Sequence, residues 1–188
     1  MTQASLVVIP AFNEERSVGS VVEDVRALGY PACVVDDGSE DRTCAVAEAA
    51  GATVLKLPVN LGVGGALRCG FRFAVAEGYR VVVQVDGDGQ HEPAEIPHLL
   101  GTLTRTHADM VIGSRFLTDN DYPVHPGRRL VMNILARRAS AAARSRITDA
   151  TSGFRAIRVP LLNFFAEEYP VEYLSLIHIS EPTRQAEI

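Results

Sequence analysis

Two aspartates separated by one glycine follow a hydrophobic run near the middle of the chain. Residues 85–91 read "VDGDGQH" and come directly after "YRVVVQ". Carboxylates two residues apart on an extended backbone point to the same side, where they repel each other unless a cation lies between them. A glycine after each aspartate removes side-chain bulk and lets a ligand approach the backbone. The pattern predicts a divalent cation that carries phosphates; the alternative is a polar Asp/Gly turn that only ends a strand.

Polar residues also follow two earlier hydrophobic runs. After the first run comes "PAFNEE", and after the second comes "DDGSEDRT", which places Asp36 and Asp37 side by side. Two adjacent carboxylates are more than a helix cap needs, and Asp37 is placed to accept hydrogen bonds from a base or ribose. The alternative is capping, because an acidic residue such as Glu14 suits a helix N-terminus and Ser39 or Asp41 can cap the next helix.

A glycine-rich segment, "NLGVGGALRCG", follows the third hydrophobic run at a helix entry. It lacks the Gly-Lys-Ser/Thr ending of a Walker motif, and it is not a G-x-G-x-x-G placed after the first strand. In open α/β sheets ligands bind at the carboxyl ends of the strands. Several polar strand ends at one edge therefore favour a metal and nucleotide site more strongly than any one motif does.

The elements that position these residues alternate along the chain. Nearly continuous β-branched runs predict strands of a parallel sheet that is covered on both faces. They lie at residues 5–10, 32–37, 52–58, 80–86 and 108–114. Helical spacing lies between them at residues 14–28, 41–50, 63–77 and 93–106. Strand alternating with helix predicts βαβ units and an α/β fold in one domain.

The composition excludes several classes of protein. The chain has 188 residues, of which 47% are hydrophobic and 22% charged, and a net charge of −5. A general nucleic-acid binder needs a basic excess that is absent here. Three cysteines without a Cys-x-x-Cys pair fit neither a disulfide framework nor a zinc site and favour a reducing cytoplasm. The sequence shows no run of 18 apolar residues and no signal-peptide pattern at its start.

The motifs together resemble a known family. "VVIPAFNEE", "VVDDGSEDRT", "NLGVGGALRCGF", "VQVDGDGQHEP", "IGSRF" and "DATSGFRA" occur in this order. Over about residues 5 to 170 the chain resembles a family 2 glycosyltransferase of the GT-A fold. Within that family it is similar to the dolichol-phosphate mannose synthase-like branch, which loads sugars onto polyprenyl phosphates. The resemblance implies a Rossmann-like, mostly parallel sheet with helices on both faces.

The resemblance also implies roles for individual residues. Contacts to a nucleotide-sugar, GDP- or UDP-linked, fall on Pro10, Phe12, Glu14, Val35, Asp37, Asp86, Gly87 and Arg115. Metal ligands fall on Asp86, Asp88 and Gln90, and such hard oxygen ligands favour Mg²⁺ or Mn²⁺. The catalytic positions are Asp88 and Asp149. The implied reaction is a single in-line displacement that inverts the anomeric carbon.

The role of Asp149 depends on the acceptor. A sugar hydroxyl needs a general base, for which Asp149 is the natural candidate. A polyprenyl phosphate is already ionised and needs none, so Asp149 would then orient Arg155 or the metal shell. The alternative is that Asp149 caps the local turn through Ser152.

A basic segment favours contact with a membrane surface. Residues 126–147 carry six arginines among apolar residues, with no acidic residue. Anionic headgroups or a lipid phosphate would be their partner, at the cytoplasmic face of the membrane. A helix that docks on the domain itself remains the alternative.

The last residues break the strand and helix rhythm. "LSLIHISEPTRQAEI", residues 174–188, resembles translated sequencing-adapter DNA, whereas family members normally continue with further strands and a basic patch. We therefore expect a glycosyltransferase domain over 1–173 that is truncated, followed by a loosely attached, non-native tail and an open sheet edge. The expected function is inverting transfer to a polyprenyl phosphate. The alternatives are transfer to a saccharide hydroxyl and an inactive fragment that binds nucleotide-sugars.

Overall fold

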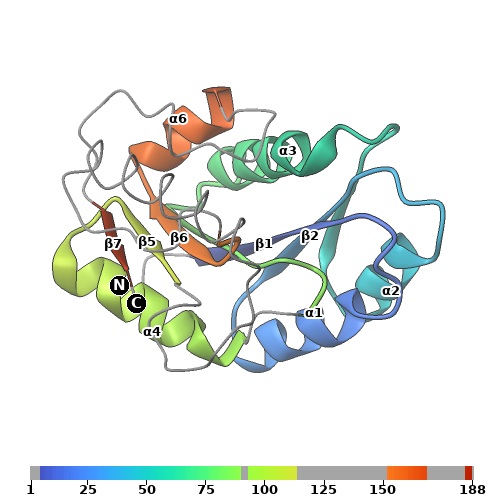
Figure 1. Ribbon diagram of the computed structural model, residues 1–188, viewed down its shortest axis with the longest axis horizontal. Coiled ribbons are helices and arrows are strands. Elements are labelled where there is room, and N and C mark those ends of the chain that lie inside the picture. Colours follow the sequence, from blue (N-terminus) through green and yellow to red (C-terminus); the bar gives the residue numbers. More distant parts are fainter. Residues whose placement is uncertain (1–4, 90–92, 114–151, 169–184, 188) are drawn as a thin grey trace, which may run out of the picture.

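The computed structural model describes residues 5–89, 93–113, 152–168 and 185–187. Within these ranges one seven-stranded sheet has the order β3-β2-β1-β4-β6-β5-β7 (Figure 1). Its strands are β1 (Ser5–Ala11), β2 (Ala32–Asp36), β3 (Thr53–Lys56), β4 (Val81–Gln84), β5 (Met110–Ile112), β6 (Arg155–Arg158) and β7 (Gln185–Glu187). The helices are α1 (Val18–Ala27), α2 (Thr43–Ala49), α3 (Gly62–Ala76), α4 (Ile96–Thr106) and α6 (Leu161–Glu168), with a 3₁₀ turn η1 at Pro93–Glu95.

The sheet is mostly parallel, as the hydrophobic runs predict. β1 pairs in parallel with β2 and β4, and β2 pairs in parallel with β3. Only β6 runs the other way among the described strands, and it pairs antiparallel with β4 and β5. Every residue of β2 and β4 is buried, which is expected of strands covered on both faces. The predicted α/β fold is confirmed.

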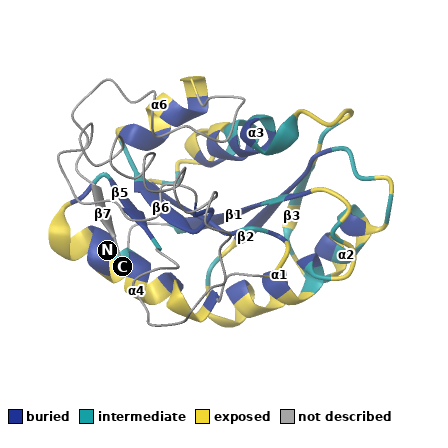
Figure 2. Ribbon diagram, viewed as in Figure 1, coloured by how far each residue is buried: buried dark blue, intermediate teal, exposed yellow. Residues whose placement is uncertain are grey.

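Helices cover both faces of the sheet, and the sheet separates two layers of the hydrophobic core (Figures 1 and 2). On one face Val8 packs with Phe71 of α3 and Phe165 of α6, and these two rings stack with centroids 6.2 Å apart. On the other face Val7 packs with Val22 of α1, in a layer that also includes α4. Neighbouring residues of β1 thus point to opposite layers, so the strand is anchored on both sides.

The pairing of β6 and the helix after it are not predicted from the sequence. β6 reads "RAIR", so two arginines interrupt the hydrophobic run that would mark a strand. Arg155 is nevertheless buried, with 1% of its surface exposed, and its Nε donates to the carbonyl of Ser152 at 2.7 Å. A polar side chain inside the sheet is the reason that hydrophobicity alone misses this strand.

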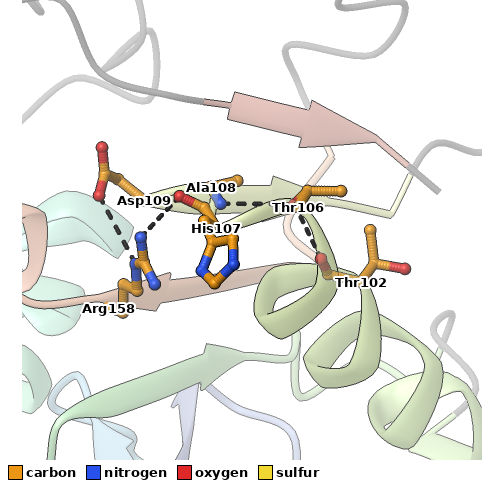
Figure 3. Close-up of polar contacts among 6 residues, drawn as sticks. All are labelled: Thr102, Thr106, His107, Ala108, Asp109 and Arg158. Carbon is orange, nitrogen blue, oxygen red and sulfur yellow. Dashed lines mark hydrogen bonds and ion pairs between the residues drawn. The ribbon is translucent and has the colours of Figure 1, made fainter.

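Arg158 of β6 contacts residues at the end of α4 and just before β5 (Figure 3). Its guanidinium donates to the carbonyl of His107 at 2.6 Å and lies 3.6 Å from a carboxylate oxygen of Asp109. His107 ends α4 in the left-handed conformation, and the hydroxyl of Thr106 donates to the carbonyl of Thr102 at 2.8 Å. This cluster lies at the start of β5 and thus at the edge opposite the carboxyl ends of β1, β2 and β4.

The end of the chain differs from expectation at three residues. β7 pairs in parallel with β5, with Met110 opposite Gln185 and Ile112 opposite Glu187. The expectation of a loosely attached tail and an open edge is therefore wrong at this strand. The physical reason is that an edge strand offers unpaired N–H and C=O groups to any extended segment. The proposed domain boundary at residue 173 and the non-native origin of the tail stay predictions.

Among the described helices, none is both long enough and apolar enough to cross a lipid bilayer. The basic segment at 126–147 lies outside the described residues.

Candidate functional site

A cavity of about 200 Å³ opens at the carboxyl ends of β1, β2 and β4. The register explains its position, because Ala11 at the end of β1 lies beside Asp36 of β2 and Val8 lies beside Gln84 of β4. Residues that follow β2 and β4 therefore emerge on either side of β1. The cavity is lined by Pro10, Ala11, Phe12, Glu14, Asp37, Val63, Ala66, Asp86, Gly87 and Asp88.

The two adjacent aspartates after β2 have different surroundings. Asp37 lines the cavity, is only 3% exposed, and accepts a hydrogen bond from the backbone N–H of Leu61 at 2.7 Å. That bond holds the residue before α3, so Asp37 anchors the helix entry as well as the cavity wall. Asp36 is fully buried, and its Oδ1 accepts from the N–H of Ser39 at 3.0 Å. Within the part of the chain that the structure describes, its Oδ2 has no hydrogen-bond partner.

The loop after β1 is tied to the loop after β2. The N–H of Asn13 donates to the hydroxyl of Ser39 at 2.9 Å, and the Asn13 side chain accepts from the N–H of Glu40 at 3.0 Å. Asn13 adopts a positive φ of 57°, which asparagine tolerates better than most residues. Glu14 lines the cavity while its carboxylate accepts from the hydroxyl of Ser17 at 2.9 Å. Hydrogen bonds therefore join the two loops into one wall of the cavity.

The N-cap of α2 is Arg42, and Asp41, which the sequence offered as a cap, lies one residue before it and bonds the first residue of the helix. Asp41 accepts hydrogen bonds from the N–H of Thr43 at 2.9 Å, from the Thr43 hydroxyl, and from the N–H of Glu15 at 3.2 Å. Burial alone would raise the pKa of Asp41, but these hydrogen bonds outweigh it and lower the pKa below its usual value. Asp41 therefore belongs to the loop scaffold, and the structure gives it no place in the cavity lining.

The Asp86–Asp88 segment reaches the cavity from β4. Asp86 is half-buried, Asp88 is exposed, and both line the cavity. Gly87 between them is buried, and a Cβ added there would lie 3.1 Å from the carbonyl oxygen of Pro10. Gly87 therefore lets the backbone of β1 come close, so that the ends of β1 and β4 lie together.

The oxygen donors of this cavity are of the kind that a hard cation prefers. Asp86, Asp88 and Glu14 all line it, and carboxylates suit Mg²⁺ and Mn²⁺ better than they suit softer metals. Among the described residues no group of three His, Cys, Asp or Glu side chains has the arrangement to hold a metal ion. The described donor set therefore fits such a cation through the two aspartates, with further ligands needed from phosphates, water or other residues.

The other predicted site residues either do not line the cavity or lie outside the described part of the chain. Val35 is fully buried in the layer beneath α3 and does not line the cavity, so its contact with a nucleotide stays a prediction. Val63 and Ala66 of α3 do line it, and only the glycine-rich helix entry indicated them in the sequence. Three predicted residues lie outside the described part of the chain, namely Gln90, Arg115 and Asp149.

The chain is similar in sequence to known proteins over most of its length. The family model described as "Glycosyl transferase family 2" matches residues 6–165. The polyprenol monophosphomannose synthase of Mycolicibacterium smegmatis is 35% identical over 86% of this chain and 64% of its own length. The undecaprenyl-phosphate mannosyltransferase of Micrococcus luteus is also 35% identical, over 84% of this chain and 67% of its own. The chain thus spans about two thirds of the length of these two relatives.

A solved structure has the same fold. Glucosyl-3-phosphoglycerate synthase from Mycobacterium tuberculosis, in complex with Mn²⁺ and UDP-glucose, superimposes with a TM-score of 0.70 and 26% identity. The match covers 99% of this chain and 69% of that one.

Proposed function

The chain belongs to glycosyl transferase family 2, as its motifs indicated, and from this we propose that it transfers a sugar from a nucleotide-sugar to a polyprenyl phosphate. The observation that carries the proposal is the cavity where Asp37 lies beside one strand end and Asp86 and Asp88 lie beside another. Relatives that are 35% identical over more than four fifths of the chain are named for polyprenol and undecaprenyl phosphate.

The nucleoside would lie on the β2 side of the cavity. Asp37 is buried there, and its carboxylate would accept hydrogen bonds from a base or ribose while it holds the N–H of Leu61. Phe12, 46% exposed at the rim, offers a flat apolar surface for a base. β1 separates β2 from β4, so the two ends of the cavity are about 10 Å apart at the usual strand spacing. An extended nucleoside diphosphate spans a comparable distance.

The diphosphate would lie on the β4 side. We propose that Asp86, Asp88 and Gln90 hold a divalent cation there, as the donor chemistry allows and as Mn²⁺ in the solved relative supports. A bound Mg²⁺ or Mn²⁺ would supply charge neutralisation for the leaving nucleoside diphosphate. Arg115 is proposed to face the same phosphates. Without a cation, the carboxylates of Asp86 and Asp88 would repel a diphosphate, so donor binding should depend on metal.

The acceptor decides what chemistry the protein must add. The oxygen of a polyprenyl phosphate is already ionised at neutral pH, so displacement with inversion needs positioning and no general base. Asp149 would then orient Arg155 or the metal shell. The arginines of 126–147 would hold the protein at the cytoplasmic face of the membrane, where such an acceptor is found.

A second candidate function is transfer to a hydroxyl acceptor. The observation that favours it is the fold match to a glucosyl-3-phosphoglycerate synthase, although that protein is less identical than the two lipid-phosphate relatives. In that reaction Asp149 would be the general base.

Transfer assays with defined donors and acceptors separate these functions. Purified protein with Mn²⁺ is given GDP-mannose, UDP-glucose or UDP-N-acetylglucosamine, together with undecaprenyl phosphate, dolichyl phosphate or 3-phosphoglycerate. The proposal expects one donor to yield a glycosylated polyprenyl phosphate, and EDTA or Asp88→Ala to abolish the product. Transfer only to 3-phosphoglycerate or another hydroxyl would support the second function. Metal-dependent donor binding with no transfer to any acceptor would leave a nucleotide-sugar-binding module.

A further inference from the structure

Gly153, two residues before β6, lies directly against the Asp86 carboxylate. β4 and β6 pair antiparallel with Gln84 opposite Arg155, so the continuing register places Asp86 opposite Gly153. Residues that lie opposite in an antiparallel pair project to the same face of the sheet, with their Cβ atoms about 5 Å apart. At Gly153 the contact is closer than that, because a Cβ built on its backbone would overlap both carboxylate oxygens of Asp86.

The backbone conformation does not explain why this residue is glycine. Gly153 is absent from the glycines with positive φ among the described residues, which include Gly38, Gly62 and Gly89. Other residues could therefore adopt its backbone conformation, and what they lack is space. The space that a side chain would occupy is filled by the carboxylate of Asp86.

Residues on both sides hold Gly153 in place. Ser152 is fully buried, and its hydroxyl accepts a hydrogen bond from the N–H of Phe154 at 3.2 Å. The guanidinium of Arg155 donates to the carbonyl of Ser152 at 2.7 Å, also in a buried setting. On the next strand the N–H of Gly113 donates to the carbonyl of Phe154 at 2.8 Å. Because the segment is fixed in this way, an added side chain would displace Asp86 more readily than it would displace the backbone.

We propose that Gly153 is a positioning residue that sets where the Asp86 carboxylate lies in the cavity. Asp86 is short and lines the cavity, so a methyl group at residue 153 would force its carboxylate away from its present position. The proposal rests on the proposed function, in which this carboxylate helps to hold the cation of the donor. Gly153 itself contacts neither cation nor sugar and acts through Asp86.

A double-mutant cycle tests this role with two readouts. Gly153→Ala, Asp86→Ala and the double variant are compared for Mn²⁺-dependent affinity by calorimetry, with UDP or GDP according to which the unchanged protein binds, and for thermal unfolding without ligand. Gly153→Ala alone should weaken nucleotide binding in Mn²⁺ on the order of tenfold to hundredfold, the range seen when residues that orient metal ligands are changed. In the Asp86→Ala background it should weaken binding no further. It should also lower the melting temperature less there, because the new methyl group enters the vacated space.

Two other glycines provide controls. Gly113→Ala would overlap the ring of Phe154 on the neighbouring strand without touching Asp86, so it should lower the melting temperature equally in both backgrounds. Gly101→Ala, on the exposed face of α4, meets no atom of the described residues within 4 Å and should bind the nucleotide like the unchanged protein.

The outcomes distinguish the two proposals. Equal effects of Gly153→Ala with and without the Asp86 carboxylate, in a protein that binds UDP or GDP with Mn²⁺, would overturn the positioning role alone. Coupled stabilities in a protein that shows no Mn²⁺-dependent binding of either UDP or GDP would overturn the proposed function, and the positioning role with it. Full nucleotide affinity in Gly153→Ala would also refute the positioning role.

Discussion

Removal of the Asp37 carboxylate separates two roles that the structure gives to one side chain. Asp37 is 3% exposed, lines the cavity, and accepts the Leu61 N–H at 2.7 Å at the entry to α3. Asp37→Ala removes both the anchor of the helix and the proposed partner of the nucleoside. Asp37→Asn keeps an acceptor oxygen for Leu61 but removes the charge.

The sizes of the two effects follow from the hydrogen bonds. A hydrogen bond to a charged group contributes about 1.5–3 kcal/mol, so Asp37→Ala should destabilise the fold by about that amount. At roughly 2–4 °C per kcal/mol for a chain of this size, the melting temperature should fall by about 3–12 °C. Asp37→Asn should lose less stability than Asp37→Ala because Leu61 keeps a partner. If the charge also contacts the base or ribose, both variants should bind free nucleoside about 10- to 150-fold more weakly.

The assay is calorimetry with uridine and with guanosine in EDTA, beside thermal unfolding of the same samples. Metal-free nucleoside isolates the base and ribose contact from the diphosphate. Unchanged nucleoside affinity in Asp37→Asn would refute the proposed contact and leave Asp37 as a helix anchor. A loss that appears only with UDP or GDP would move Asp37 to the phosphate side of the cavity.

Three further predictions concern the scaffold and the membrane. Gly70→Ala should be about 1–3 kcal/mol less stable than Gly101→Ala by chemical denaturation. Both variants gain helix propensity, but a methyl group at residue 70 would lie 2.5 Å from Val8. Equal stabilities of the two variants would contradict this packing. Burial raises the pKa of Cys33 to about 12, so iodoacetamide at pH 8 should label this thiol only after the protein unfolds. Rapid labelling of Cys33 in the native protein, detected by mass spectrometry, would contradict the burial. Glutamine in place of the paired arginines of 126–147 should weaken co-sedimentation with anionic liposomes at low salt, and the membrane proposal fails if binding is unchanged. The arginines to replace are Arg128, Arg129, Arg137 and Arg138.

Strands with nearly continuous hydrophobic runs could be predicted from the sequence, because burial on both faces favours apolar residues at most of their positions. β1, β2 and β4 lie where those runs are, and the predicted helices begin and end within a few residues of the observed ones. β6 could not be predicted this way, because Arg155 is buried by hydrogen bonding inside the sheet. Its pairing between β4 and β5 joins segments far apart in the chain, which local patterns do not record.

The residues that line the cavity could be predicted where they are carboxylates at the ends of predicted strands. Asp37, Asp86 and Asp88 follow strand ends, and the parallel register brings them to one cavity. Val35 was assigned by resemblance alone, and its side chain points into the core because neighbouring strand residues alternate between faces. The proposed role of Gly153 could not be predicted from "TSGFR", because that role depends on Asp86 lying against it in the fold.

The central claim is that Asp86 and Asp88 hold a divalent cation that binds the diphosphate of a nucleotide-sugar. Calorimetric titration of UDP and GDP into the unchanged protein, Asp86→Ala and Asp88→Ala, each with Mn²⁺ and with EDTA, tests it most directly. The account predicts that one nucleotide binds the unchanged protein far more tightly with Mn²⁺ than with EDTA. It also predicts that each variant loses this metal dependence while it still unfolds cooperatively. Equal Mn²⁺-dependent affinity in the unchanged protein and in both variants would contradict the claim.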